Sequence, residues 1–300
     1  AVELMELKTE NPTKETVHVK ETNRFLMIQK SDGYSYAFNK LTGLFEQIKI
    51  KEKELLVHPM EINIWRAPTD NDRKEKLKWM DAHYDQSYAR AYETSYEIKE
   101  GRVIIHSTLS VSAPTVQRIL NIKVDWMIDL DGSISVAMDV EKDMEFPMLP
   151  RFGIRLFLEK AFNQVEYYGI GPEESYVDKY RAGCHGRYRA EVREMHEDYL
   201  RPQENGSHTD CDYLCVNSSD YVFAAVSETP FAFNVSEYTQ EELTKKAHSY
   251  EIESSGMTVV CLDYAQNGIG SNSCGPELLE KYRLDKKNFK FEMKMIFKEQ

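Results

Sequence analysis

The sequence predicts an all-β fold, a large antiparallel β-sandwich with a few short helices. β-branched or alternating segments run through residues 103–112, 116–130, 133–140 and 152–158. Almost no amphipathic helix separates them, and Asp131-Gly132 is an explicit hairpin turn. Frequent strands without intervening helices are typical of antiparallel sandwiches and not of βαβ units.

The first strands form a predicted meander. Residues 25–30 and 34–39 flank Ser31-Asp32-Gly33, a three-residue connection with glycine where a left-handed residue is needed. Residues 44–50 alternate and follow a second turn that ends at Gly43. Three sequential strands of this kind predict one antiparallel sheet.

Two short helices interrupt the predicted strands. Residues 73–84 have helical composition, with Leu77, Met80 and Tyr84 on one face and Trp79 beside them. Residues 240–249 form a second candidate, capped by Thr239. Strands are predicted at 213–216, 221–227, 231–236, 259–264 and 289–297.

Composition limits the partners. The 300 residues carry a net charge of -12, which argues against binding to nucleic acid or to an anionic membrane. No apolar run approaches the ~18 residues that span a bilayer. The polar opening segment, residues 1–23, is expected to be a linker from a preceding domain, with the folded domain over 24–300.

The five cysteines favour a reducing compartment, because their number is odd and their spacing is not that of a disulfide scaffold. We expect the cytoplasm, with the periplasm as the alternative. His208, Cys211 and Cys215 raise the question of zinc, but no CxxC pair occurs. Reduced cysteines in or near strands are the favoured interpretation, and no metal site is predicted.

Residues 167–206 are predicted to be an ordered, extended loop. Gly169, Gly171, Gly183, Gly186 and Pro202 interrupt any long helix or plain strand, and the tyrosines argue against disorder. Pattern alone leaves two interpretations open, a functional loop and a long crossover between sheets.

Three polar loops stand out, at residues 65–73, 167–206 and 267–276. Each combines hydrogen-bonding side chains with aromatic or small residues, which suits sugar recognition. Pattern alone favours a structural role for the first loop, in which Asp70 or Asp72 caps a helix and Arg66 is an ion partner. No nucleophile or general acid is identified, and Gly268-Ile269-Gly270 lacks the context of a nucleotide motif.

Four motifs occur in a fixed order. They are Arg66-Ala67-Pro68-Thr69-Asp70-Asn71-Asp72, Tyr168-Gly169-Ile170-Gly171-Pro172-Glu173-Glu174-Ser175-Tyr176 with Asp178, Arg201-Pro202-Gln203-Glu204-Asn205-Gly206, and Gly268-Ile269-Gly270 through Ser273-Cys274-Gly275-Pro276. Together they resemble the C-terminal small-chain domain of the β-galactosidases of glycoside hydrolase family 2. The resemblance implies an antiparallel supersandwich of the galactose mutarotase type.

The resemblance implies a retaining β-galactosidase that hydrolyses terminal β-D-galactosides, of which this chain supplies active-site rim loops. The two catalytic glutamates would lie on a preceding barrel, so no residue here is assigned a catalytic role, and the isolated chain is expected to be inactive. Magnesium and sodium would bind at barrel-associated sites, and no cofactor is assigned to this chain.

The resemblance also assigns binding residues. Asn272, Ser273 and Cys274 would contact substrate, with Cys274 in place of a family tryptophan on which the sugar or aglycone stacks. The residues that would hold these substrate-contacting residues in position, without touching the substrate, are Arg66, Asp70, Asn71 and Asp72. Glu204 and Asn205 would be chiefly structural. The implied partners are the barrel, an immunoglobulin-like domain before residue 24, and further copies of the chain in a homo-oligomer.

Two other classes of function stay open. A sandwich of this kind could bind carbohydrate by itself, or it could serve mainly to assemble an oligomer.

Overall fold

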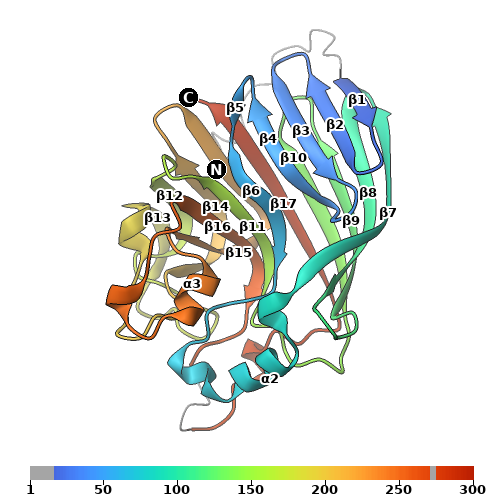
Figure 1. The fold of residues 1–300 in the computed structure, drawn as a ribbon. Helices are drawn as coiled ribbons and strands as arrows, with labels where there is room; N and C mark the ends of the chain where they lie inside the picture. Colours follow the sequence, from blue (N-terminus) through green and yellow to red (C-terminus); the bar gives the residue numbers. More distant parts are fainter. Residues whose placement is uncertain (1–16, 271–274) are drawn as a thin grey trace.

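The computed structural model describes residues 17–270 and 275–300, and it has two antiparallel sheets packed face to face (Figure 1). Every pairing between the described strands is antiparallel, which confirms the predicted fold class. Asn272, Ser273 and Cys274 lie outside the described residues.

The smaller sheet has the strand order β1-β2-β3-β4-β5. Its strands are β1 (Val17–Glu21), β2 (Phe25–Lys30), β3 (Tyr34–Asn39), β4 (Leu44–Ile50) and β5 (Lys53–Glu54). The predicted hairpin and third strand are confirmed. The predicted boundary at residue 24 is wrong for the sheet, because β1 pairs with β2 and Val17 and Val19 pack against the core.

The larger sheet contains the remaining twelve strands. They are β6 (Leu56–Asn63), β7 (Tyr88–Lys99), β8 (Arg102–Ser112), β9 (Leu120–Ile128), β10 (Ile134–Lys142), β11 (Arg151–Glu159), β12 (Gln164–Gly171), β13 (Cys184–Glu191), β14 (Ser207–Asn217), β15 (Tyr221–Ser236), β16 (Met257–Gln266) and β17 (Asn288–Glu299). The main path runs β13-β12-β14-β15-β17-β10-β9-β8-β7, and a branch continues from β15 through β16 and β11 to β6.

Aromatic packing joins the two sheets. Phe45 of β4 meets Trp126 of β9 edge to face, with ring centroids 5.3 Å apart. Trp126 is fully buried and donates its indole N–H to the Gly43 carbonyl at 3.1 Å, and the Tyr36 hydroxyl donates to the Gly132 carbonyl at 2.6 Å. The smaller sheet therefore lies over the half of the larger sheet that contains β7 to β10 (Figure 1).

The extended loop predicted over residues 167–206 is wrong in part, because β12 continues to Gly171 and β13 pairs with it along its whole length. The glycines permit close strand packing instead of breaking the strands. A Cβ on Gly169 would lie 2.2 Å from the Cys211 sulfur of the neighbouring β14. Residues 172–183 and 196–206 are the parts that lie outside regular strands and helices.

The helix predicted over residues 73–84 is shorter in the structure, and a different side of it is buried. It divides into η1 (Asp70–Arg73), α2 (Glu75–Asp81) and η2 (Tyr84–Gln86). Trp79 and Tyr84 are buried, whereas Leu77 and Met80 are exposed, contrary to the predicted face. The seven-residue helix α2 ends at Asp81, so Tyr84 lies beyond it. The spacing i, i+3, i+7 of Leu77, Met80 and Tyr84 therefore does not define one face of this helix.

Other elements follow the prediction with shifted ends. The helix α3 (Gln240–Lys245) begins after Thr239, whose hydroxyl accepts from the Glu242 amide at 3.2 Å. The remaining short turns are η3 (Val192–Met195), η4 (Ser249–Glu251) and η5 (Glu280–Tyr282). The strand β7 was not predicted, because its exposed and polar residues at the sheet edge carry little apolar signal.

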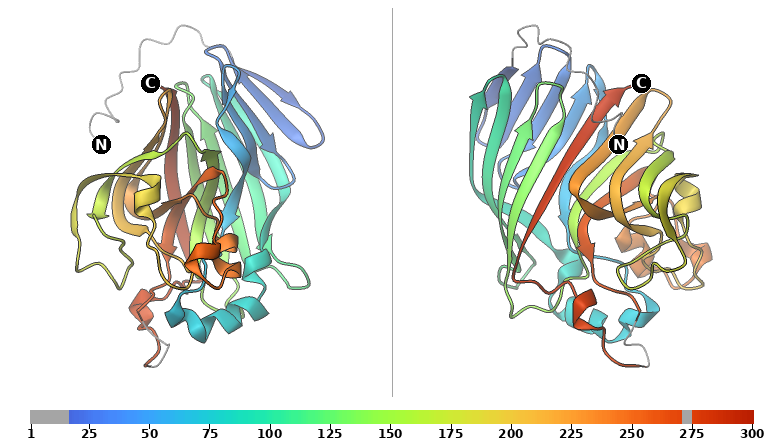
Figure 2. Two further views of the ribbon diagram at one scale, coloured as in Figure 1. Left: turned by 60° about the vertical axis from the view of Figure 1, so that its left-hand side comes forward. Right: turned by 180° about the vertical axis from the view of Figure 1, so that it is seen from behind.

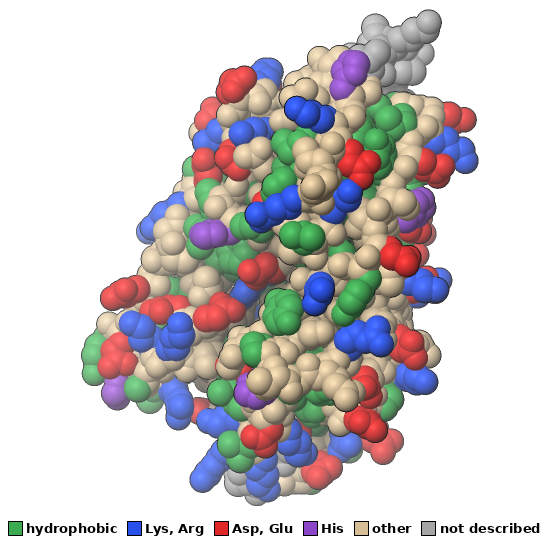
Figure 3. Space-filling model, turned by 45° about the vertical axis from the view of Figure 1, so that its right-hand side comes forward, with side chains coloured by type: hydrophobic (Ala, Val, Ile, Leu, Met, Phe, Trp, Pro, Cys, Tyr) green, Lys and Arg blue, Asp and Glu red, His purple; other side chains and the backbone are tan. Residues whose placement is uncertain are grey.

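Several loops gather at one end of the sandwich, where α2 and the segment that follows β16 lie close together (Figure 2). The C-terminus lies at the opposite end. On the face drawn in Figure 3, acidic and basic side chains are interspersed and apolar ones are scattered. None of the helices within residues 17–270 and 275–300 has the length and hydrophobicity needed to cross a bilayer.

Candidate functional site

Arg66 lies at the centre of the loop end. Its side chain is fully buried, and its Nη2 donates to Asp72 Oδ1 at 2.7 Å while its Nε donates to Asp72 Oδ2 at 3.2 Å. Arg66 also donates to the carbonyl of Asn267 and, at 3.2 Å, to that of Gly268. A planar guanidinium thus joins the first motif to the glycine-rich fourth motif.

Further hydrogen bonds from Asp72, Asn71 and Asp178 fix the same two segments. Asp72 Oδ2 accepts from the Thr69 amide at 2.8 Å and from the Thr69 hydroxyl at 3.0 Å, so it also closes the turn before α2. Asn71 donates its side-chain amide to the Ile269 carbonyl at 2.7 Å. Asp178, from the second motif, accepts from the amides of Ile269 at 3.0 Å and Gly270 at 2.7 Å.

Arg151 joins the third motif to the sheet. It is fully buried, with its Nη1 2.7 Å from Glu204 Oε1 and its Nε 3.1 Å from Asp263 Oδ1. Glu204 Oε2 accepts from the Ala67 amide at 3.0 Å. The third motif is therefore bonded to both the first motif and the strands β11 and β16.

The four motifs thus meet in one hydrogen-bonded cluster, which we call the loop junction; it is buried around Arg66 and Arg151 and half-buried at Asp178. It comprises Arg66, Asn71, Asp72, Asp178, Gln203, Glu204, Arg151, Asp263 and the backbone of residues 267–270. Burial raises the pKa of Glu204 and of Asp263, and the Arg151 guanidinium opposes that rise. Removing one member of such a buried ion pair would leave the other charge uncompensated and would lower the free energy of unfolding by about 3–5 kcal/mol.

The predicted supporting residues differ in their placement. Arg66, Asn71 and Asp72 belong to the loop junction, whereas Asp70 is exposed and joins it through its amide, which donates to Gln203 Oε1 at 2.8 Å. Thr69, and not an aspartate, is the residue that precedes the helical turn as its N-cap. Support of substrate-contacting residues stays a prediction for all four, as does substrate contact for Asn272, Ser273 and Cys274.

Sequence reasoning missed Arg151 and Asp263. The signal was present, because both are charged residues inside strongly apolar strand segments, RFGIRLFL and VVCLDYA. A charge at such a position must be paired when the strand is buried. The sequence could not say which residue is the partner of which.

A groove of about 440 Å³ borders the loop junction. Its walls include Ile170, Val177 and Tyr180 from the second motif region, with Tyr264 and Gln266 from β16. The Gln266 Nε2 donates to Ser207 Oγ at 2.9 Å, while its buried Oε1 has no hydrogen-bond partner within the described part of the chain. The surface beside the junction can therefore contact a ligand through apolar and amide groups.

Glu173, Glu174 and Glu197 together line a pocket of about 230 Å³, where an acid and base pair could be sought. Burial, Glu174 and Glu173 raise the pKa of Glu197. However, Glu174 already accepts hydrogen bonds on both oxygens, from Lys179 and Tyr199 on Oε1 and from Tyr176 and the Gly206 amide on Oε2. Glu174 thus crosslinks loops and is not free to act as a nucleophile.

The zinc alternative is not supported. The His208 ring packs against both Tyr167 and Phe233, which also contact each other, and its Nδ1 lies 3.0 Å from the Ile170 carbonyl oxygen. Cys211 and Cys215 are buried free cysteines of β14, as expected for reduced cysteines in strands. Over residues 17–270 and 275–300, no group of three or more His, Cys, Asp or Glu side chains is arranged to hold a metal ion.

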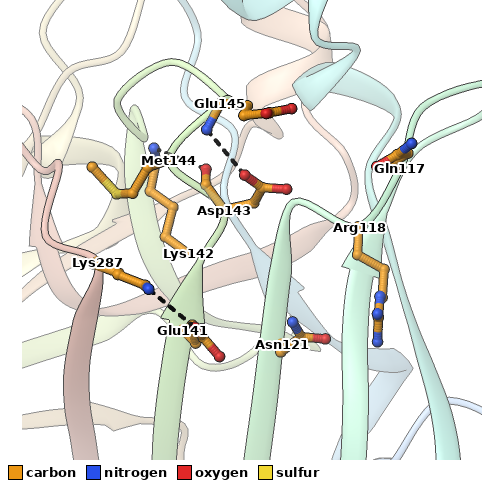
Figure 4. A pocket seen from close by; sticks show the side chains of 9 residues that line it. All are labelled: Gln117, Arg118, Asn121, Glu141, Lys142, Asp143, Met144, Glu145 and Lys287. Carbon is orange, nitrogen blue, oxygen red and sulfur yellow. Dashed lines mark hydrogen bonds and ion pairs between the residues drawn. The ribbon is translucent and has the colours of Figure 1, made fainter.

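A larger pocket, with a volume of about 780 Å³, lies elsewhere, at the ends of β9 and β10 (Figure 4). Both lysines in its wall are paired, Lys287 with Glu141 at 3.7 Å (Figure 4) and buried Lys142 with Asp285 at 3.0 Å. None of the four motifs contributes to its walls. It is therefore not the candidate site.

Comparison with known proteins first defines the class of fold. The galactose 1-epimerase of Lactobacillus acidophilus NCFM superposes with a TM-score of 0.51 at 10% identity, over 96% of this chain and 99% of that one. The chain thus has the two-sheet architecture of that epimerase.

The particular family follows from the sequence. A family model described as the β-galactosidase small chain matches residues 30–295, and the chain belongs to that family. A β-galactosidase of Actinobacillus pleuropneumoniae is 43% identical over 95% of the chain, and one of Staphylococcus xylosus is 34% identical over 93%. The chain spans 28% of the length of each of these relatives.

His208, which bonds to the second motif, generates a prediction about pH. Burial lowers the pKa of His208 to about 4, from the ordinary value of 6.5. Between these values the unfolded chain binds a proton that the folded chain does not, so stability falls as the pH is lowered from about 6.5 to 4. The expected loss in unfolding free energy is at most about 3 kcal/mol.

Urea unfolding at pH 7 and at pH 4.5 measures this loss. His208→Gln should show a smaller difference between the two pH values than the natural chain, whatever its absolute stability. His58→Gln, at an exposed histidine, is the matched control and should keep the full difference. Equal differences for all three proteins would contradict the role given to His208.

Proposed function

We propose that this chain acts as a C-terminal, non-catalytic domain of a retaining β-galactosidase and holds loops at the rim of the active site. The observation that carries the proposal is the loop junction, in which the first and second motifs bond directly to the backbone of residues 267–270 and the third motif holds the first in place. Buried, mutually paired charges of this kind position a segment and do not carry out acid and base chemistry.

The catalytic carboxylates are assigned to another part of the enzyme. A retaining mechanism needs two accessible carboxyl groups about 5 Å apart. Glu204 and Asp263 share Arg151 but are closed to substrate, with side-chain exposures of 1% and 0%. The barrel implied by the family resemblance is the proposed source of both glutamates.

The same proposal covers the partners. The preceding barrel and immunoglobulin-like domains would contact the loop end of the sandwich, and the enzyme would assemble as a homo-oligomer. The magnesium and sodium that the family resemblance implies are assigned to barrel-associated sites, and none is assigned to this chain. Cys274 in place of a stacking tryptophan would give a smaller, softer contact to the aglycone.

Complementation is the first test. The chain alone should not hydrolyse o-nitrophenyl β-D-galactoside, because it supplies no catalytic pair. The remainder of the parent enzyme should be inactive without this domain, and mixing the two should restore hydrolysis. Hydrolysis by the chain alone would contradict the proposal, and so would full activity of the remainder alone.

Asp178 gives a second, more local test in the whole enzyme. Asp178→Asn leaves one acceptor oxygen for the two backbone amides of Ile269 and Gly270. The side-chain NH₂ group of the asparagine would then face the other backbone N–H, and the lost hydrogen bond costs about 1–3 kcal/mol. We expect kcat/KM for o-nitrophenyl galactoside to fall about tenfold, with a small change in melting temperature.

The matched control for Asp178→Asn is Asp220→Asn, the same change at an exposed residue. Its kinetics should equal those of the natural enzyme. Unchanged kinetics in Asp178→Asn, with a folded enzyme, would remove the link between the loop junction and the active site.

A further inference from the structure

The outermost strand of the larger sheet has one edge that no other described strand covers. β7 is the terminal strand of the sheet and pairs with β8 alone among the described strands (Figure 1). Its side chains from Ser95 to Lys99 are exposed or half-buried, and Ile98 is 50% exposed. Unpaired N–H and C=O groups along a sheet edge are a template on which a further strand can pair.

The turn between β7 and β8 determines which backbone groups face outward. Glu100 and Gly101 both have positive φ, of 53° and 79°, as a two-residue type I′ turn requires. Lys99 and Arg102 close this turn and are therefore a hydrogen-bonded pair. Hydrogen-bonded residues alternate with residues whose N–H and C=O groups point away from the partner strand. The residues of β7 that present these groups to the open edge are thus Thr94, Tyr96 and Ile98.

This edge segment, residues 94–98, lacks the usual protection of an edge strand. Earlier in β7 the Ala91 amide donates to the Leu41 carbonyl at 2.8 Å, and a β-bulge lies between Ala91 and Glu93. Bulges and prolines are the devices that commonly keep an edge from pairing. Residues 94–98 contain neither, and no backbone group elsewhere in residues 17–270 and 275–300 bonds to their open side.

The edge segment is complementary to a second copy of itself. When two β7 strands pair antiparallel about Tyr96, Thr94 lies opposite Ile98 of the second copy. The same register places Glu93 opposite Lys99, and twofold symmetry forms that ion pair twice. Within the described part of the chain, the side chains of Glu93 and Lys99 have no hydrogen-bond or ion-pair partner. Both charges are therefore available for a partner strand.

The neighbouring registers are less favourable. A shift of one strand by two residues keeps the outward backbone groups aligned. In one direction it places Glu97 opposite Glu93 of the second copy, and in the other direction it places the two copies of Glu97 opposite each other. Like charges directly opposite one another destabilise a strand pair. The charges thus select the register centred on Tyr96.

We propose that the open edge of β7 is a dimerisation surface, on which a second copy of this chain adds its own β7 antiparallel and centred on Tyr96. Backbone groups of Thr94, Tyr96 and Ile98 bond across the twofold axis, and the exposed Ile98 side chain is covered. Residues 94–98 lie in the half of β7 farther from α2, so the loop end stays open (Figure 1). This inference rests on the homo-oligomer of the proposed function, but not on the loop junction or on hydrolysis.

Sedimentation equilibrium of the chain over a range of concentrations tests the proposal. About 0.15 M salt screens the repulsion between two chains that each carry a net charge of -12, and a monomer–dimer equilibrium is expected. Lys99→Glu places two glutamates opposite each other and should weaken the dimer about fivefold or more. Lys123→Glu, at an exposed lysine of β9, is the matched control and should leave the dissociation constant unchanged.

An exchange of charges tests the register. Glu93→Lys alone should weaken the dimer, and Glu93→Lys combined with Lys99→Glu should restore the natural dissociation constant to within about twofold. Ile98→Pro, which removes one outward N–H from the edge, should weaken the dimer about tenfold. If Ile98→Pro does not fold, the exchange of charges decides the question.

Three results would overturn the proposal: a chain that stays monomeric, equal dissociation constants for Lys99→Glu and Lys123→Glu, or no recovery in the double variant. None of them bears on complementation of the parent enzyme or on Asp178→Asn, so a failure of this surface is distinct from a failure of the rim-loop function.

Discussion

Two buried guanidinium groups hold the loop end of this domain together. Arg66 bonds the first motif to the backbone of the fourth, and Arg151 bonds the third motif to two strands of the larger sheet. Neither charge is accessible to water, so each is stable only while its carboxylate partners stay in place. The positions of four loops are therefore interdependent.

The sandwich supplies the rigid support that this arrangement needs. β11 and β16 pair along nine residues of β11 and carry Arg151 and Asp263 opposite the third motif. A segment bonded at several points to such a support loses little further freedom when it meets a substrate or another domain. The described part of this chain, which belongs to the family of the β-galactosidase small chain, is thus built to hold its loops in fixed positions.

Much of the fold was predictable from alternation and turn signals. The hairpin around Gly33, the turn at Gly132 and the closing strand β17 have strong local patterns, and the structure confirms them. The glycines of residues 167–206 misled the prediction, because their role depends on a neighbouring strand, as Gly169 beside Cys211 shows. Tertiary packing also decides which face of α2 is buried, with Trp79 inside and Leu77 exposed, and no local pattern indicates that choice.

The candidate site was predictable only as a set of motifs. Their fixed order indicated the family, but sequence spacing alone does not show that Asp178 reaches Gly270, 92 residues away. Charged residues in apolar strands, such as Arg151, signal that a buried partner exists without naming it. Which charged residues pair with each other depends on the tertiary fold, and only the structure identifies the partners.

Amide hydrogen exchange in an Arg66→Met variant tests the interdependence of the loops most directly. The account predicts that the Thr69, Ile269 and Gly270 amides, from two distant segments, exchange at least about tenfold faster together, while amides of β9 keep their protection. If only amides next to residue 66 changed, or if Ile269 and Gly270 kept their natural exchange rates, the buried guanidinium would not be what holds these loops.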